Sequence, residues 1–255
     1  MARSDPFKSI LLGALVAALL VGGIVWLMSL ERVSRQTQQD PTAPIAASLA
    51  PGPVIEAPDA AAPSSPAGIA IRVDQGWLAA VAQATGIPAR ALAAYAGAQL
   101  RLADEAPSCR IGWNTLAGIG RIESGHGSHG GASIDAEGVV APPILGIQLD
   151  GSSSAVINDS DNGALDGDAE WDRAVGPMQF IPDTWSRWGA DGNADGITNP
   201  HQIDDAALAA ARYLCASGDL SGAERWRAAI FSYNHSEQYV TDVADAANAY
   251  AGQVG

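Results

Sequence analysis

The sequence predicts a mostly α-helical domain with a long irregular insertion, preceded by one transmembrane helix and a disordered linker. Three observations lead to this prediction. Residues 10–30 are uncharged and apolar, residues 31–69 are rich in proline and alanine, and helical periodicity with capping residues dominates from residue 70 onward. With 255 residues, 47% of them hydrophobic, the chain is long enough for one sizeable domain plus extensions.

The N-terminal apolar run of 21 residues would span roughly 30 Å as a helix, about the thickness of a bilayer core. We interpret residues 1–9 as a cytoplasmic N-terminus and residues 10–30 as an uncleaved transmembrane signal anchor. A cleaved signal peptide is the alternative, although its apolar core is typically shorter. Either interpretation exports the rest of the chain.

Residues 31–69 hold 7 of the 15 prolines and show neither a helical nor a strand period. This composition is typical of a disordered linker, whose reach as polyproline II would be roughly 120 Å. Such a length suits a domain, at residues 70–255, that acts at some distance from a membrane.

The exported domain is strongly acidic. From residue 70 onward the chain has 10 arginines, no lysine and 23 acidic residues, which gives a net charge of −13. Such a surface is poorly suited to neutralising phosphates, so nucleic acid is not expected as a partner. An uncharged or cation-binding partner fits this composition better.

Seven helices are expected in this domain. Asp74 can cap the first helix and Gly86 can end it, while Pro88 opens the second helix at a first-turn position. The expected helices cover residues 74–86, 88–106, 112–123, 182–189, 203–218, 222–236 and 237–251.

The third helix carries the strongest apolar face before the chain turns irregular. This face consists of Trp113, Leu116, Ile119 and Ile122. A glycine-rich break follows at 125–131. Residues 132–170 then form the insertion, in which 142–149 is strand-like and several turn dipeptides occur. An irregular segment of this length in a compact domain is typically functional.

The two cysteines, Cys109 and Cys215, both lie in the exported part, where an oxidising compartment favours a disulfide. The bridge would close a loop of about 100 residues, which the chain-entropy model values at roughly 4–5 kcal/mol. Two unpaired buried thiols are the alternative, and two cysteines alone make a poor metal site.

Glu123 ends the apolar helix and precedes Ser124 and a glycine, so its carboxyl could point into a cleft. Burial among apolar residues would raise its pKa, as a general acid at neutral pH requires. A solvated helix-terminal glutamate is the alternative. Ser124 lacks the frame of a nucleophile elbow, and His126 and His129 have no third metal ligand at a known spacing.

An aspartate-rich stretch at 191–205 matches the first half of an EF-hand loop. The matching residues are Asp191, Asn193, Asp195 and Gly196. Oxygen ligands at alternate positions let one tight turn surround a hard cation, and calcium fits such flexible geometry better than magnesium. The standard twelfth position is Gln202, which offers no carboxylate, but Asp204 and Asp205 could close a lengthened loop. A turn without metal is the alternative.

A second acidic stretch, 159–172, places Asp159, Asp161 and Glu170 at EF-hand positions 1, 3 and 12. Its fifth and sixth positions are glycine and alanine, which is the wrong turn chemistry. We therefore interpret it as a solvated acidic loop rather than as a second cation site.

Six tryptophans lie in the domain, and aromatic faces can stack on sugar rings. Core packing is the alternative, and we expect it for at least half of them. The six are Trp77, Trp113, Trp171, Trp185, Trp188 and Trp226.

Four motifs occur in order: GIGRIESGHG, GPMQFIPDTWSRWG, DGNADGITNPHQIDDAALAAARYLC and YNHSEQYV. Together they resemble a lytic murein transglycosylase of the membrane-bound B type, over roughly residues 72–251. The resemblance implies a lysozyme-like helical catalytic domain. The insertion is longer than this family leads us to expect, which affects the rim of the cleft and the glycan length that it accepts.

The resemblance also implies the residues of the site. Glu123 matches the single catalytic acid/base. The substrate-binding residues are Ser124, Gln179, Tyr233 and Asn234. A structural calcium ion is implied in an EF-hand lengthened to fifteen positions, with the ligands Asp191, Asn193, Asp195, the Ile197 carbonyl and Asp205.

The implied reaction cleaves the β-1,4 bond between N-acetylmuramic acid and N-acetylglucosamine in peptidoglycan and leaves a 1,6-anhydromuramoyl end. We expect a monomer anchored in the cell membrane, with the catalytic domain on the cell-wall side. Two alternatives remain open. A lysozyme-type hydrolase would need a second carboxylate, such as Asp168, Glu170 or Asp172. A non-catalytic, calcium-stabilised module would bind peptidoglycan without cleaving it.

Overall fold

The computed structural model describes residue 57, residues 68–152 and residues 154–254. The predicted anchor and all but three residues of the predicted linker lie outside the described residues. Within the described part, no helix combines the length and the apolar character needed to cross a membrane.

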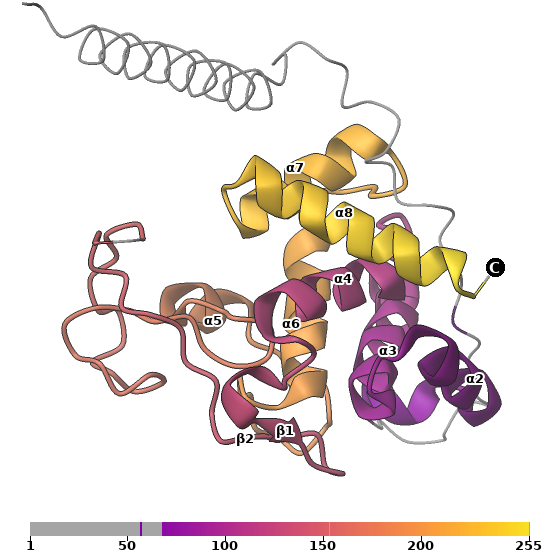
Figure 1. Ribbon diagram of the computed structural model, residues 1–255, viewed down its shortest axis with the longest axis horizontal. Helices are drawn as coiled ribbons and strands as arrows, with labels where there is room; N and C mark the ends of the chain where they lie inside the picture. Colours follow the sequence, from indigo (N-terminus) through magenta and orange to yellow (C-terminus); the bar gives the residue numbers. More distant parts are fainter. Residues whose placement is uncertain (1–56, 58–67, 153, 255) are drawn as a thin grey trace, which may run out of the picture. The chain divides into compact units, whose positions relative to one another are not determined.

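The described chain is mostly helical, as predicted (Figure 1). Its elements, in order, are η1 (Ile69–Arg72), α2 (Gln75–Thr85), α3 (Ala89–Glu105), α4 (Trp113–Ser124), η2 (His129–Gly131), β1 (Ser133–Ile134), β2 (Val140–Ala141), α5 (Pro182–Trp188), α6 (Ile203–Cys215), α7 (Ala223–Tyr233) and α8 (Glu237–Gly252).

Local signals begin and end the helices where the sequence predicts them. The Asp74 carboxylate accepts a hydrogen bond from the Trp77 amide at 2.8 Å, and Gly86 ends α2 with a φ of 70°. The Ser236 hydroxyl caps α8 by accepting from the Tyr239 amide. All seven predicted helices are confirmed, with differences of a few residues at their ends.

The strand-like segment at 142–149 does not join the sheet, so this part of the prediction is wrong. In the described part the sheet consists of β1 and β2, paired antiparallel. Pro142 and Pro143 follow β2 directly and have no N–H to donate, so the ladder stops there. Leu145 makes an isolated bridge with Val175 instead.

Helix α4 lies against α8, and α3 lies against α6 (Figure 1). On the predicted apolar face of α4, Trp113, Leu116 and Ile119 are fully buried, whereas Ile122 is 39% exposed. Burial of each such side chain contributes roughly 1.5–3 kcal/mol, so this face fixes α4 firmly in the core. The residue that follows the buried face, Glu123, therefore has a well-defined position.

Cys109 and Cys215 form the predicted disulfide, with their Cα atoms 5.3 Å apart. The bridge joins the segment before α4 to the last residue of α6. It therefore cross-links the connection between α3 and α4 to the end of α6.

The insertion folds into a lobe, defined here as residues 142–175, which projects from the helices at the left of Figure 1. Backbone hydrogen bonds between its segments hold it together. Gly146 donates to the Ala174 carbonyl at 2.8 Å, and Asp159 donates to the Glu170 carbonyl at 3.1 Å.

Carboxylates organise the turns of this lobe. The Asp159 side chain accepts hydrogen bonds from the amides of Asp161, Asn162 and Gly163 at 2.9–3.2 Å. Asp166 and Asp172 are 6% and 0% exposed. The prediction of a solvated acidic loop is therefore wrong for these two residues, whose side chains support the backbone from inside.

Candidate active site

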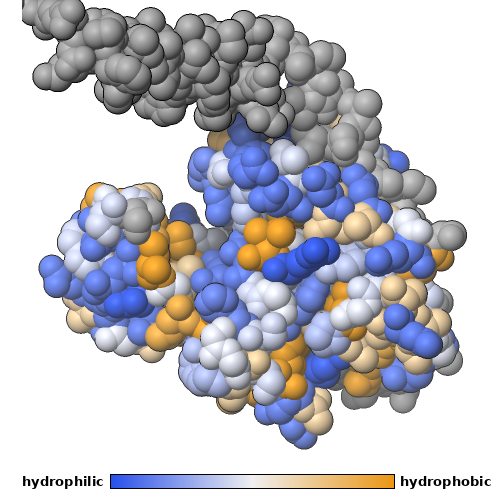
Figure 2. Space-filling model, viewed as in Figure 1, coloured by the Kyte–Doolittle hydropathy of each residue, from blue (hydrophilic) through white to orange (hydrophobic). Residues whose placement is uncertain are grey.

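A pocket of about 420 Å³ opens between the lobe and the helices. Figure 2 shows a hollow between the lobe and the helical body on this face of the molecule. The pocket is lined by Glu123, Leu149, Ile157, Ala174, Gln179, Phe180, Ile181, Thr184, Tyr213, Ser232, Tyr233, Asn234 and His235.

Glu123 enters this pocket from the end of α4. Gly125 follows with a φ of 58°, which ends the helix and leaves the carboxyl free of the next turn. The Tyr239 hydroxyl of α8 donates to Glu123 Oε1 at 2.5 Å. Burial raises the pKa of Glu123 to about 7, and the hydrogen bond from Tyr239 opposes part of that rise. The carboxyl can therefore both donate and accept a proton near neutral pH.

A tight hairpin, residues 175–180, forms the wall beside Glu123. Val175 and Phe180 exchange two backbone hydrogen bonds at 2.8 and 3.0 Å. Gly176 has a φ of 77°, and a Cβ there would overlap the Pro200 carbonyl, so this position requires glycine. Gln179 has a φ of 49°, which is unusual for a residue with a side chain. Backbone strain of this kind concentrates at functional sites.

Two hydroxyl groups from different helices hold this hairpin. The Ser124 hydroxyl donates to the Pro177 carbonyl at 2.6 Å, and the Tyr233 hydroxyl donates to the Met178 carbonyl at 2.8 Å. The hairpin is thereby tied to the end of α4 and to the end of α7. The Gln179 side-chain amide donates to the Gly176 carbonyl at 2.9 Å. The position of Gln179 is therefore set by both helices.

Four of the five residues expected at the catalytic site line the same pocket: Glu123, Gln179, Tyr233 and Asn234. Ser124 is 3% exposed and is not among the lining residues. Its hydroxyl also accepts from the Gly127 amide at 2.8 Å, so it is fully used in holding loops.

Residues 156–228 match the family model of the transglycosylase SLT domain. The match supports the lytic transglycosylase family and an enzyme that acts on peptidoglycan. The matched stretch includes Gln179 and the aspartate-rich loop, whereas Glu123 lies outside it. Comparison with curated proteins and with solved structures finds no match.

Sequence reasoning missed Tyr239, the partner of Glu123. It is one of two tyrosines on the amphipathic helix α8, where the expected role is core packing. Only the packing of α8 on α4 reveals its contact, since 116 residues separate the two side chains. None of the six tryptophans lines the pocket, where the aromatic rings are Phe180, Tyr213 and Tyr233. Trp113, Trp185 and Trp226 are buried in the core.

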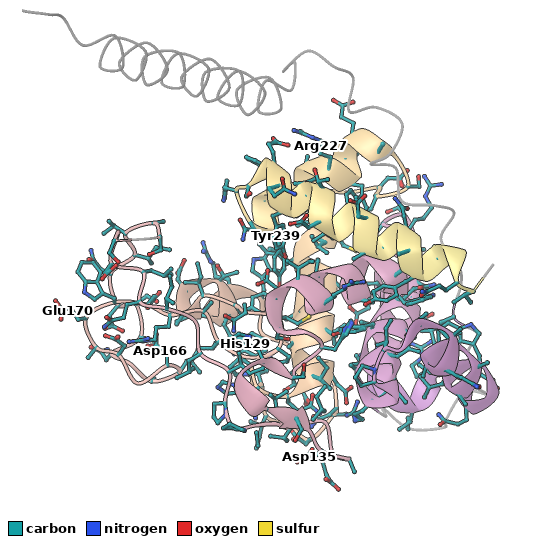
Figure 3. The ribbon with its side chains drawn as sticks, viewed as in Figure 1. His129, Asp135, Asp166, Glu170, Arg227 and Tyr239 are labelled. Atoms are coloured by element: carbon teal, nitrogen blue, oxygen red, sulfur yellow. A yellow bond between two sulfur atoms is a disulfide. The ribbon has the colours of Figure 1, made fainter. Side chains whose placement is uncertain are left out.

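The other acidic residues considered for a second catalytic carboxylate lie away from the pocket lining. Asp168 accepts from Gln148 at 2.6 Å and pairs with Arg173, and these contacts lower its pKa to about 2. Glu170 points away from Tyr239 at the outer end of the lobe (Figure 3). Asp172 is buried and accepts from the Ser160 hydroxyl at 2.8 Å. Among the described residues that line the pocket, Glu123 is the only carboxylate.

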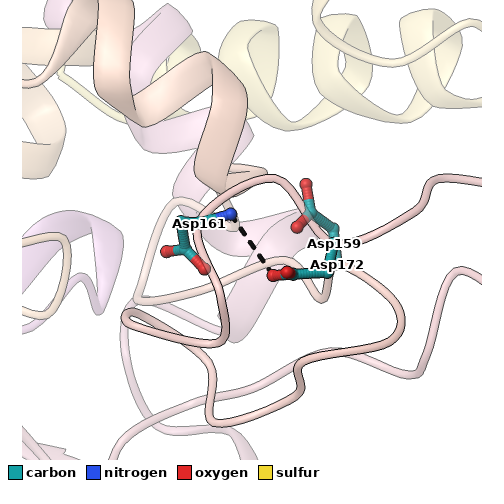
Figure 4. A group of neighbouring side chains, drawn as sticks. All are labelled: Asp159, Asp161 and Asp172. Atoms are coloured by element: carbon teal, nitrogen blue, oxygen red, sulfur yellow. Dashed lines mark hydrogen bonds between the residues drawn. The ribbon is translucent and has the colours of Figure 1, made fainter.

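One acidic group in the described part gathers its oxygens within 4.8 Å of one another: Asp159, Asp161 and Asp172 (Figure 4). The Asp161 amide also donates to Asp159 Oδ1 at 3.2 Å. The EF-hand comparison placed Glu170 in this set. The fold brings in Asp172 instead, because residues 158 and 171 form a bridge that turns Asp172 inward.

The aspartate-rich loop at 191–205 is folded as a single turn around its own carboxylates. Asp191 accepts from the amides of Asp195 and Gly196 at 3.1 and 2.9 Å. Asp195 in turn accepts from the Ile197 amide at 2.8 Å, and the Asn193 side chain donates to Asp195. The side chains expected as calcium ligands therefore share one loop, although the carboxylates of Asp191, Asp195 and Asp205 are not gathered as closely as those in Figure 4.

Asp205 closes this loop from the first turn of α6. Its carboxylate is fully buried and accepts from the amides of Gly192, Asn193 and Asn199. Burial raises its pKa to about 6, although the backbone hydrogen bonds oppose the rise. Gln202 caps α6 rather than facing the loop, because its side chain accepts from the amides of Asp204 and Asp205. A buried carboxylate beside hard oxygen donors is a suitable site for a divalent cation.

The two histidines of the glycine-rich break differ in their surroundings. His126 is buried, with Nδ1 3.3 Å from the Tyr95 hydroxyl and Nε2 2.9 Å from the Tyr250 hydroxyl. Burial lowers the pKa of His126 to about 4, so its ring is neutral at pH 7. It links α3 and α8 to the loop that follows α4. His129 is exposed.

Proposed function

We propose that this chain is a peptidoglycan lytic transglycosylase of the membrane-bound B type, which cleaves the β-1,4 bond between N-acetylmuramic acid and N-acetylglucosamine. The observation that carries the proposal is Glu123, the only carboxylate among the described lining residues, with a pKa raised to about 7 by burial. One group that can act as acid and then as base is what a one-carboxylate mechanism needs.

In the first step the protonated Glu123 carboxyl donates its proton to the glycosidic oxygen, and the bond from that oxygen to C1 of N-acetylmuramic acid breaks. Positive charge develops on the sugar, as in an oxocarbenium ion. The 2-acetamido group of the same sugar assists, as it does in substrate-assisted glycosidases.

In the second step the Glu123 carboxylate takes the proton of the C6 hydroxyl on the same sugar, and O6 attacks C1. The new bond closes the 1,6-anhydro ring, no water is consumed, and the carboxyl returns to its protonated state. The hydrogen bond from Tyr239, at 2.5 Å, stabilises the carboxylate between the two steps.

The remaining lining residues bind and orient the glycan. Tyr213 and Tyr233 offer ring faces for the pyranose rings. Gln179 and Asn234 offer amide groups for the hydroxyl and acetamido substituents. The strained, doubly pinned hairpin fixes Gln179 before substrate arrives, which lowers the entropy lost on binding.

The decisive experiment is mass spectrometry of the fragments that the full-length protein, in detergent, releases from purified peptidoglycan, with Glu123→Gln as the control. We expect muropeptides lighter by one water than hydrolytic products, and their loss in the control. Products with ordinary reducing ends would make the chain a hydrolase. A folded protein that releases nothing in a Glu123-dependent way would favour the binding module.

Two further parts of the proposal rest on the sequence. The run at 10–30 anchors the monomeric protein in the cell membrane, with the catalytic domain on the cell-wall side. Calcium, held by Asp191, Asn193, Asp195, the Ile197 carbonyl and Asp205, has a structural role. The loop offers oxygen donors and one fully buried carboxylate, Asp205, which fit this ion.

A further inference from the structure

The lobe supplies one wall of the catalytic pocket. Three of its residues line the pocket together with Glu123: Leu149, Ile157 and Ala174. All three side chains are aliphatic, and each is partly exposed. The helical side of the pocket differs, because it presents aromatic rings and polar groups from Tyr213, Ser232, Tyr233, Asn234 and His235. The pocket is therefore aliphatic on the lobe side and amphipathic on the other.

The backbone holds the two larger wall residues, Leu149 and Ile157, in a fixed relation. Ile157 donates to the Leu149 carbonyl at 2.7 Å, Leu149 donates to the Asp172 carbonyl at 3.1 Å, and Asp172 donates to the Ile157 carbonyl at 3.1 Å. The Asp172 side chain is buried and accepts from the amide and the hydroxyl of Ser160. This closed set of contacts preorganises the wall.

The aliphatic surface continues outside the pocket. Leu145, Ile147 and Val156 are 42%, 59% and 65% exposed. Figure 2 shows hydrophobic residues of the lobe beside the hollow that separates it from the helical body. The lobe therefore exposes aliphatic side chains both inside and outside the pocket.

We propose that Leu149 and Ile157 are specificity-determining residues, which receive the acetamido methyl groups of the bound glycan and so discriminate against de-N-acetylated strands. This inference rests on the proposed function, because it takes the pocket around Glu123 to be the glycan site.

The chemistry of the two walls supports this assignment. Glycan bound in the pocket lies between the lobe on one side and Tyr213 and Tyr233 on the other, so its substituents can contact both walls. An acetamido methyl group gains contact with Leu149 and Ile157 there. A free amino group, charged at neutral pH, would lose water against aliphatic side chains that offer no hydrogen bond. The acidic residues of the lobe give no compensation, since none of them lines the pocket.

Binding to a chain that cannot cleave separates this inference from the reaction type. Full-length protein with Glu123→Gln is titrated with soluble glycan strands from peptidoglycan, and with the same strands after chemical de-N-acetylation. We expect tighter binding of the acetylated strands. Leu149→Ser and Ile157→Ser, each added to Glu123→Gln, should reduce the affinity ratio about tenfold, the effect of one lost aliphatic contact in a pocket.

The matched control is Ile147→Ser in the same background, because Ile147 lies in the same lobe, is 59% exposed and does not line the pocket. It should leave the affinity ratio unchanged. Leu149→Met keeps the volume and the apolar character of the side chain and should therefore keep the affinity ratio. This variant controls for a general loss of folding on substitution of Leu149. Equal binding of both strand types by the Glu123→Gln chain, or equal effects of Leu149→Ser and Ile147→Ser, would overturn the inference. Neither result depends on whether wild-type products carry anhydro ends.

Discussion

The chemistry at the residue scale depends on a pair of side chains from different helices. Glu123 stands at the end of α4, and Tyr239 reaches it from α8 with a hydrogen bond of 2.5 Å. Burial raises the pKa of the carboxyl and the tyrosine lowers it, so the balance of the two leaves the pKa at about 7. A pKa near the operating pH is the optimum for a group that must give and then take a proton.

Tyr239→Phe should shift this balance. The variant loses the hydrogen bond that lowers the pKa of Glu123, so that pKa rises and the protonated form persists to higher pH. Activity requires the protonated acid, and the alkaline fall of kcat/KM should therefore move to higher pH. The maximal rate should drop about ten- to hundredfold, because the carboxylate formed in the first step loses its donor.

The pH profile of cleavage in Tyr213→Phe provides the control. Tyr213 lines the same pocket, but its hydroxyl donates to the Ser232 carbonyl at 2.7 Å and not to Glu123. In Tyr213→Phe the alkaline fall of kcat/KM should occur at the same pH as in the wild type. A shift of equal size in both variants would contradict the role given to Tyr239.

Glu123→Gln should stabilise the protein in a pH-dependent way. The pKa of Glu123 is about 7 when folded, against an ordinary value of 4.5, so the fold favours the neutral form. Below pH 4.5 both states are protonated and the substitution should be nearly neutral. Above pH 7 the folded wild type carries a disfavoured charge, and the variant should gain on the order of 1–3 kcal/mol in unfolding free energy.

Urea denaturation at about pH 4 and about pH 8 tests this sign. Glu170→Gln is the control, since Glu170 is an exposed glutamate at the outer end of the lobe. A stabilisation of the same size in Glu170→Gln would show that the effect is not specific to the buried carboxyl. A stabilisation by Glu123→Gln that is larger at acidic pH would contradict the assigned direction of the shift.

At the scale of elements, the positions of α4 and α7 determine where the hairpin at 175–180 lies in the site. Ser124 at the end of α4 and Tyr233 at the end of α7 each donate to one of its carbonyl groups. A disturbance of either helix end is thereby passed to Gln179. The hairpin itself depends on one residue, Gly176, against which the Pro200 carbonyl is packed.

Gly176→Ala should therefore damage both folding and activity. Gly176 and Gly167 have φ values of 77° and 78°, so alanine is strained to the same extent at both positions. Only at Gly176 would the added Cβ also overlap a backbone carbonyl, whereas nothing lies within 4 Å at Gly167. We expect Gly167→Ala to cost about 1 kcal/mol and Gly176→Ala more than about 3 kcal/mol. Thermal melts of the two variants compare them directly. Equal losses of stability would show that backbone strain alone, and not the overlap with the Pro200 carbonyl, determines the cost.

The sequence predicts the helices well because their signals are local. Asp74, Gly86 and Ser236 act within one turn of the helix ends that they define. The contact between Tyr239 and Glu123 has no such signal, because it depends on how α8 packs on α4. The prediction for the lobe is wrong in part for the same reason. Asp172, and not Glu170, joins Asp159, since pairing across the insertion decides which side chain turns inward.

At the scale of the whole domain, helix α6 connects the stabilising features to the pocket. Its first turn carries Asp205, buried against the aspartate-rich loop, and its last residue is Cys215 of the disulfide. Tyr213, near that end, lines the pocket. The sequence indicated Asp205 and the disulfide separately, and it did not indicate Tyr213. Only the fold shows that one helix, fixed at both ends, carries all three.

Calcium binding should stabilise this arrangement as a whole. A ligand that binds only the folded state at about one hundred times its Kd adds roughly 2.7 kcal/mol to the unfolding free energy. Protein prepared with chelator should therefore melt several degrees lower than the same protein with calcium restored. Asp205→Asn should abolish the response to added calcium. Asp172→Asn, in the acidic group of the lobe, should leave the response intact. A calcium response that disappears in Asp172→Asn but persists in Asp205→Asn would contradict this assignment. It would place the ion in the lobe instead of in the loop before α6. The metal would then stabilise the aliphatic wall of the pocket and not the helical core.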